Sequence, residues 1–345
     1  MSVETSAWLN NYTLIGNTLK RGNAWHYRAA DQGLEPNHYP GFVPCEDVKR
    51  RLFNWDAQEA TIAATCMDAN GVTTFADPTR KAVVRPVGAL HADDMGGIMG
   101  IFKDGYQTHQ FSDWLIDSVA DLMGDDLGIE SAGLLKSGAV AWVQISMPDT
   151  MQVAGFEFRP HLLACTSHDG TLATTYLRGC TAVVCDNTMS AALGEAGTLK
   201  VKVKHSRYSS LKLQNAADAL QIVHATGDAF AAQVERLTNV QVSEGDWNAF
   251  LDTLAPVPEQ EGRAATMAEN KRAQLANLYY NDTRVAPWHG TAWGVVQAVN
   301  THAHHVANAH GGKVAERNAL RAASGKVDAL DMGTLAMLEG VLASA

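Results

Sequence analysis

The sequence lacks paired cysteines, long apolar runs and a secretory signal. Its five cysteines, in 345 residues, include no Cys-x-x-Cys pair, which argues against a disulfide framework and a thiolate zinc site. No segment reaches the roughly 18 apolar residues that a membrane helix needs. Residues 1–16 lack the basic leader and apolar run of a secretory signal. We therefore expect a globular protein of a reducing cytoplasm, without membrane contact.

Motifs that bind nucleotides or activate a nucleophile are also missing. The chain has no GxxxxGK[ST] loop, no GxSxG elbow and no HExxH pair. Its glycines at positions 96, 97 and 100 lack the spacing of a dinucleotide site. ATP-driven recombinases and other nucleotide-driven machines are therefore not expected. We predict a protein that is not an enzyme, with no catalytic residues, no cofactor and no metal.

Two groups of residues suggest chemistry on first inspection. Ser167, His168 and Asp169 are adjacent and resemble the members of a hydrolase triad. Neighbours on an extended chain point to opposite sides, however, so they cannot form the relay that a triad requires. We favour a turn at Asp169 and Gly170 between two strands.

Histidines gather between His289 and His310, where His302 and His305 lie one helical turn apart and suggest metal ligands. No carboxylate flanks them at ligand spacing, which favours a solvated or capping cluster. A metal-dependent hydrolase is the weakest of the alternatives.

Positive charge is scarce, but it is concentrated in one place. The chain has 27 lysines and arginines against 37 acidic residues, a net charge of -10. This balance argues against indiscriminate coating of nucleic acid, because non-specific affinity rises with the number of phosphates neutralised. Between Glu195 and Asp218, however, there is no acidic residue, and the cations there are Lys200, Lys202, Lys204, Arg207 and Lys212. Such a concentration on an acidic protein indicates a polyanionic partner.

Lysine and valine alternate from residue 200 to residue 204. In a strand this spacing places Lys200, Lys202 and Lys204 on one face and the intervening valines on the other. We call residues 200–207 the cationic strip. Lysines on an edge strand also guard against aggregation, which is the competing interpretation. A second basic strand around Lys81 and Arg85 favours a functional role.

The patterns before residue 214 are mainly those of strands. Period-two alternation predicts strands at about 140–147, 156–166 and 171–177, then a short strand at 181–185 and a helix from Asn187 to Leu193. Earlier in the chain, short strands are expected at 62–66, 72–75 and 81–87, with a hairpin turn at Asn70-Gly71, and a helix at 113–123 with Ser112 as its N-cap. The order strand, strand, strand, helix predicts an antiparallel sheet with covering helices, an α+β fold.

From residue 214 the chain has helical periodicity. A four-three spacing of apolar residues from Ala216 to Leu237 forms one seam, which we expect to pack within the subunit rather than in a coiled coil between subunits. Further helices are predicted at about 264–280, 291–309 and 329–342. We therefore divide the chain into a mixed segment at 1–60, an α+β core at 61–213 and a helical region at 214–345.

Six short motifs occur in order over roughly residues 81–306, and together they resemble the phage- and plasmid-borne family catalogued as domain of unknown function 932. The motifs are Lys81-Ala-Val-Val-Arg85, Ala132-Gly133-Leu134-Leu135 followed by Gly138 and Trp142, Ser167-His-Asp-Gly170, Val183-Val-Cys185-Asp-Asn187-Thr188, Lys204-His205-Ser206, and Gly290-Thr291-Ala292-Trp293. The family usually has Arg-His-Thr at 204–206. Lysine keeps the charge there but lacks the planar fork of arginine.

The context and strand order of this family resemble those of single-strand annealing proteins such as RecT/Redβ. The resemblance implies an ATP-independent protein of the bacterial host cytoplasm that binds and anneals single-stranded DNA as a ring or filament of identical subunits. Lys200, Lys202, Lys204, His205 and Arg207 would hold phosphates, with Lys81, Arg85 and Lys212 as secondary contacts. The alternative is a non-enzymatic phage or plasmid factor that counters a host defence system.

Overall fold

The computed structural model describes most of the chain, and contacts divide it into two compact units. The described residues are 10–23, 29–33, 35–69, 71–120, 127–147, 149–182, 188–190, 200–206, 223–307, 317–318, 321 and 326–344. The first unit is built from residues 1–148, 162–177 and 200–222, and the second from residues 149–161, 178–199 and 223–345. Each unit is described by itself below.

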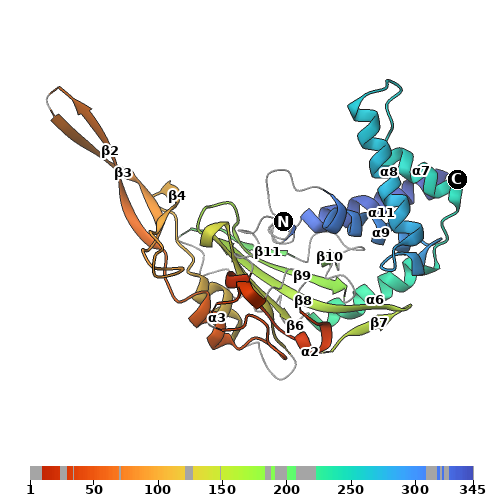
Figure 1. Cartoon of the computed structure of the whole chain (residues 1–345), viewed down its shortest axis with the longest axis horizontal. Coiled ribbons are helices and arrows are strands. Elements are labelled where there is room, and N and C mark those ends of the chain that lie inside the picture. The colour runs from red at the N-terminus through yellow and green to blue at the C-terminus, as the bar shows by residue number, and fades with distance from the viewer. Residues whose placement is uncertain are drawn as a thin grey trace. The chain divides into compact units, whose positions relative to one another are not determined.

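Among the described residues, eight strands form one sheet (Figure 1). The strands are β1 (Thr13–Ile15), β5 (Gly128–Leu135), β6 (Val140–Ser146), β7 (Met151–Val153), β8 (Phe156–Ser167), β9 (Thr174–Ala182), β10 (Thr188–Ser190) and β11 (Lys200–Val203). Their order is β1-β5-β6-β8-β9-β10, with β7 paired to β8 and β11 paired to β9. The α+β class predicted from the sequence is confirmed, with antiparallel sheets and a helical C-terminal region.

The strands of the first unit are buried more completely than simple alternation predicts. Every residue of β5 is buried, and β8 is buried along almost its whole length. A close cross-strand contact adds to this packing, because Gly133 pairs with Trp142 and a Cβ at residue 133 would lie 2.0 Å from the indole ring. Glycine at position 133 therefore lets the indole lie flat across the sheet.

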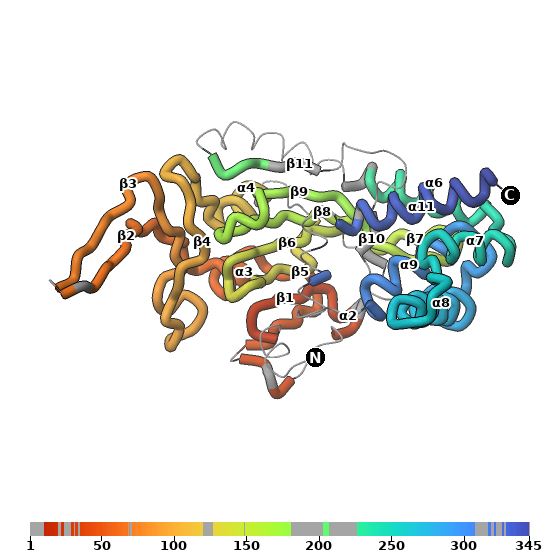
Figure 2. Tube along the Cα trace, turned by 90° about the horizontal axis from the view of Figure 1, so that it is seen from above, coloured from red at the N-terminus to blue at the C-terminus, as the bar shows by residue number. Residues whose placement is uncertain are grey.

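A second sheet in the first unit contains a long hairpin. Its strands are β2 (Gln58–Asp68), β3 (Gly71–Arg85) and β4 (Gly97–Lys103), joined in that order. The hairpin lies where it was predicted, but the strands expected at 72–75 and 81–87 are one continuous β3. Beyond the end of β4 the β2–β3 pair projects as a ribbon, here called the arm (Figure 1 and Figure 2), with Met67, Val72 and Phe75 exposed.

Short helical segments complete the first unit. They are α2 (Thr18–Arg21), α3 (Cys45–Arg51), the turn η1 (Ala29–Asp31), the π-helical η2 (Asp113–Asp117), α4 (Ser118–Ala120) and the turn η3 (Lys136–Gly138). The apolar face predicted for the helix after residue 112 is buried at Leu115 and Val119. Ser112 is not its N-cap, because it has helical dihedrals and no side-chain capping bond. Helical backbone already includes Phe111, which is buried.

The second unit is mainly helical, as predicted. Its helices are α6 (Val223–Asn239), α7 (Glu244–Leu254), α8 (Arg263–Asn281), the turn η5 (Ala286–Trp288), α9 (Ala292–Thr301), the π-helical η6 (His302–Val306) and α11 (Lys326–Ser344). All residues of α9 are buried, and Thr291 caps this helix as predicted by accepting the N–H of Gly294. The described part of the apolar seam packs within the unit, since Phe230, Val234 and Leu237 belong to its buried core. Ala216 and Leu220 of the predicted seam lie outside the described residues.

One helix prediction was wrong. A helix was expected from Asn187 to Leu193, but Thr188–Ser190 forms β10 and pairs antiparallel with Gly179–Thr181 of β9. The pairing satisfies backbone groups along the edge of β9, and tertiary pairing overrides weak local helix propensity. The remaining residues of that predicted helix lie outside the described ranges.

The closest glycine contact in α9 gives a stability prediction. A Cβ at Gly294 would lie 2.2 Å from the backbone oxygen of Trp288, which cannot move as a side chain tip can. We expect Gly294→Ala to lower the free energy of unfolding by about 3 kcal/mol, in the range of overpacked cores.

Gly333→Ala is the matched control, because Gly333 is exposed within α11 and an added Cβ there meets nothing within 4 Å. It should raise the stability by about 0.5–1 kcal/mol through helix propensity. Urea denaturation measures both values. A Gly294→Ala protein as stable as the parent would contradict the close contact at Trp288.

Candidate nucleic-acid interface

Strand β11 carries the first part of the cationic strip. It pairs antiparallel with β9, with Lys200 opposite Leu177 and Lys202 opposite Thr175. Val203, the last residue of β11, is paired with Thr174. Val203 is fully buried and Lys204 is exposed. Among the described strands β11 pairs with β9 alone.

His205 is held between two other rings. Five rings stack in the order Phe102, Tyr106, His205, His109 and Trp114, and we call this set the ring column. The successive centroid distances are 3.9, 5.0, 4.0 and 3.7 Å, with interplanar angles of 9, 20, 17 and 7°. The column contains residues from β4, from the segment before η2, from η2 itself and from the end of the strip. It fixes the backbone that follows Lys204.

Hydroxyl groups of the sheet hold the two histidines of the column. The Nδ1 of His109 lies 2.6 Å from the Oγ1 of Thr174, and the Nε2 of His205 lies 3.2 Å from the Oγ1 of Thr166. The two threonine hydroxyls are themselves 2.7 Å apart. Beside them, the ring of His168 stacks on Phe111 at 3.9 Å, and its Nε2–H donates to the carbonyl of His109.

Burial lowers the pKa of all three histidines. The pKa of His109 falls to about 3, because the ring is buried and because His205 and His168 are close. The pKa values of His168 and His205 fall to about 4, with burial as the main cause. All three rings are therefore neutral at neutral pH. His205 was predicted to hold phosphate, but a neutral stacked ring serves better as the anchor of the strip than as a charged contact.

The secondary cations Lys81 and Arg85 have carboxylate partners. Lys81 pairs with Glu59 at 2.9 Å. Arg85 pairs with Asp94 at 2.7 Å, and both side chains are nearly buried. Its bonds to this carboxylate hold the pKa of Asp94 at about 2. Both secondary cations therefore already have a carboxylate partner within the protein. Arg207, Lys212 and the predicted stacking residue Tyr208 lie outside the described residues.

The structure does not assemble a triad from residues 167–169. The hydroxyl of Ser167 accepts the N–H of Leu172 and donates to its carbonyl, while Asp169 pairs with Lys136 at 2.9 Å. His168 is buried and bonded to the backbone. Gly170 has φ of 73°, which confirms the predicted turn.

The histidines between 289 and 310 do not converge in the described part of the chain. His302 bonds to Gln274 at 3.0 Å, and His304 is buried. A search of the described residues finds no group of three or more His, Cys, Asp or Glu side chains placed to hold a metal ion. His310 is outside those residues. None of the helices in the described ranges has the length and hydropathy to span a membrane.

Comparison with known proteins gives one match. A family model described as domain of unknown function (DUF932) matches residues 98–325, a range that holds most of β4, the ring column, β11 and helices α6 to α9. Neither the curated proteins nor the solved structures provide a match.

The three low histidine pKa values predict acid sensitivity. A buried neutral histidine binds fewer protons than it does in the unfolded chain, so stability rises with pH between the folded and unfolded pKa values. We expect the thermal midpoint to fall as the pH is lowered from about 6.5 toward 4, which spans the ordinary histidine pKa and the shifted values near 4.

His109→Gln should reduce the slope of midpoint against pH in this window, because it removes one titrating ring and leaves an amide to bond Thr174. His91→Gln, at an exposed histidine, is the control and should keep the parent slope. Calorimetric scans at several pH values measure both. A His109→Gln slope identical to that of the parent would show that this ring does not link protons to folding.

Proposed function

We propose, from the premise that the chain belongs to the family described as domain of unknown function (DUF932), that it binds and anneals single-stranded DNA without ATP. The observation that carries the proposal is the edge position of β11, which contains Lys200 and Lys202, pairs with β9 alone among the described strands and leads directly into exposed Lys204. Backbone pairing and the burial of Val203 hold this strand against β9, and His205 fixes its end in the ring column.

A strand is a suitable carrier for a row of phosphate contacts. Alternate residues are about 6.6 Å apart, so the lysines form a regular line of charges. Each ammonium group that neutralises a phosphate releases a counterion, which supplies sequence-independent affinity. Lysine is a flexible point charge and does not demand the planar geometry that arginine reads. Such a row would hold a strand of any sequence, as annealing requires.

Aromatic rings accompany the charges, as in many proteins that bind single strands. Phe102 and Tyr106 form the end of the ring column next to His205, and both are half-buried. The net charge of -10 restricts phosphate binding to local positive regions. Annealing needs no bond chemistry, since reduced phosphate repulsion and exposed bases let a complementary strand find its register.

The proposal includes self-association into a ring or filament, which would repeat the strip from subunit to subunit and add weak contacts. The α6 seam is not available for this, because its described residues lie in the core of the second unit. The arm offers exposed Met67, Val72 and Phe75 and supports contact with another protein surface. The same exposure favours the second candidate, a factor that binds and disables a protein of a host defence system.

Replacing Lys200, Lys202 and Lys204 together with alanine tests the proposal. We expect single-strand affinity at low salt to fall by at least about tenfold, and the slope of log affinity against log salt to become shallower by about 2, as for the loss of three phosphate contacts. Fluorescence anisotropy with a labelled oligonucleotide over a salt series measures both quantities. The thermal midpoint should change little, because exposed cations contribute little to stability.

A variant with alanine at Arg50, Arg236 and Arg263 has the same change in net charge and is the control, since these arginines are exposed and outside the strip. It should bind as the parent does. Equal losses in both variants would indicate a non-specific charge effect. A parent protein that binds no single strand, yet captures protein partners through the arm, would favour the second candidate.

A further inference from the structure

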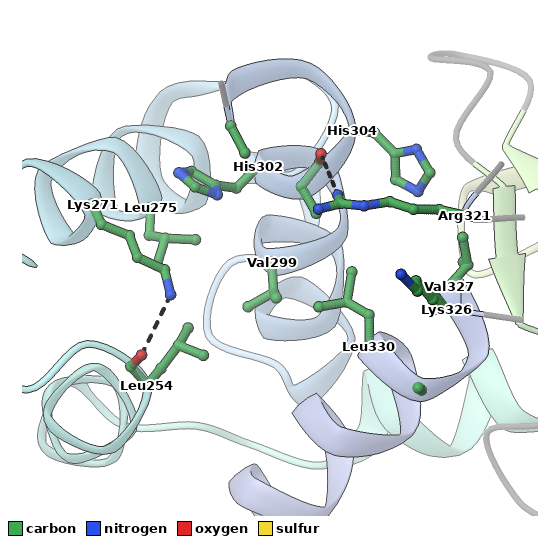
Figure 3. Close-up of a pocket in the computed structure, with 13 residues that line it drawn as sticks. Leu254, Lys271, Leu275, Val299, His302, His304, Arg321, Lys326, Val327 and Leu330 are labelled. Atoms are coloured by element: carbon green, nitrogen blue, oxygen red, sulfur yellow. Dashed lines mark hydrogen bonds between the residues drawn. The ribbon is translucent and has the colours of Figure 1, made fainter. Parts of the chain in front are cut away.

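The second unit contains a cavity that the proposed function does not use. It has a volume of about 480 Å³ and lies among the end of α7, the middle of α8, the α9–η6 junction and the start of α11 (Figure 3). This volume is within the range of small-molecule sites, roughly 300–1,000 Å³.

Most of the cavity wall is aliphatic. Leu275, Val299 and Val327 are buried residues of three different helices, and Leu254 and Leu330 are half-buried beside them. A ligand with an apolar or heterocyclic body would be shielded from water by these side chains.

The polar groups of the cavity are cationic or titrate to cations. Lys271, Arg321 and Lys326 line it, and no aspartate or glutamate is among the lining residues that the structure describes. Figure 3 shows the guanidinium of Arg321 and the ammonium of Lys326 directed into the space above Val299 and Leu330, with Lys271 on the opposite side. Positive groups that converge on an apolar cavity are the pattern of an anion site.

Two of the positive groups bond to backbone carbonyls of the cavity wall. Lys271 donates to the carbonyl of Leu254, and Arg321 to that of Ala303, in each case over a long 3.4 Å. Burial lowers the pKa of Lys271, and His302 has its pKa lowered by burial and by that lysine. The pKa of His304 falls to about 4 through burial and through repulsion by His305, Arg321 and Arg317. An anion in the cavity would relieve this repulsion.

We propose that this cavity binds a small organic phosphate, a phosphate monoester with an apolar or heterocyclic body such as a nucleoside monophosphate. A phosphate monoester carries a charge of about -1.5 to -2 at neutral pH. It can therefore pair with Lys271 on one side of the cavity and with Arg321 and Lys326 on the other, whereas a carboxylate ligand has only one negative charge. Two sources share this chemistry, a free nucleotide and the 5′-phosphorylated end of a DNA strand. The site is separate from the cationic strip and does not depend on its role.

Titration calorimetry with deoxyadenosine 5′-monophosphate tests the proposal, with deoxyadenosine and decanoate as comparison probes. We expect one site per chain for the monophosphate and at least tenfold weaker binding of the other two. A 5′-phosphorylated and a 5′-hydroxyl oligonucleotide, each measured in the presence and absence of the monophosphate, identify the source. A preference for the phosphorylated end that the monophosphate abolishes assigns the strand end. Equal binding of both oligonucleotides assigns the free nucleotide.

Two variants test whether the monophosphate binds in the cavity, one by reversing a charge and one by filling the space. Lys326→Glu reverses a charge at the first described residue of α11, where an acid favours the helix dipole, and should weaken monophosphate binding at least tenfold. Ala329→Trp places a bulky side chain at an exposed position that lines the cavity and should block it without a charge change. Arg263→Ala, on α8 outside the cavity, should bind as the parent does.

Thermal scans show whether each variant is folded. Several results would overturn the proposal. These are no binding of the monophosphate or of a phosphorylated end, tighter binding of decanoate than of the monophosphate, or unchanged binding in both folded cavity variants.

Discussion

The pairing of β11 with β9, closed by the insertion of His205 between Tyr106 and His109, is the constraint on which the proposed interface depends. Buried Val203 and the stacked ring of His205 hold the end of this lysine strand at the sheet edge. This arrangement loses stability in acid, because the buried rings of His109, His168 and His205 must remain neutral.

Local periodicity predicted a large part of this fold. The alternation of Lys202 and Val203, the buried face of Phe230 and Val234, and the Thr291 cap each depend on residues close together in sequence. The ring column was missed because its members come from separate segments around residues 102–114 and at residue 205, and stacking leaves no repeat in the sequence. The Arg85–Asp94 pair was missed for a similar reason, since the turn that brings them together is irregular.

The wrong predictions have a common physical cause. Residues 188–190 were expected to be helical from a cap signal at Asn187, but the edge of β9 offered backbone partners. Ser112 is a good cap by type, yet the helix already includes Phe111, whose burial against Phe53 and His168 decides the start. In each case a tertiary contact outweighed a local preference of a few tenths to about 1 kcal/mol. The cavity of the second unit was likewise invisible in the sequence, since its cations stand at positions 271, 321 and 326.

The length of the arm determines how far from the first sheet a partner protein could be bound. From Ile62 to Asp68 the β2 strand pairs with β3 beyond the reach of β4, and at 3.4 Å per residue this part extends roughly 24 Å. A two-stranded ribbon has no second layer to stiffen it, so we expect the arm to bend about its base. A partner bound at Met67 or Val72 would therefore stay close to the first unit without a fixed orientation. Its local concentration near the first unit would rise.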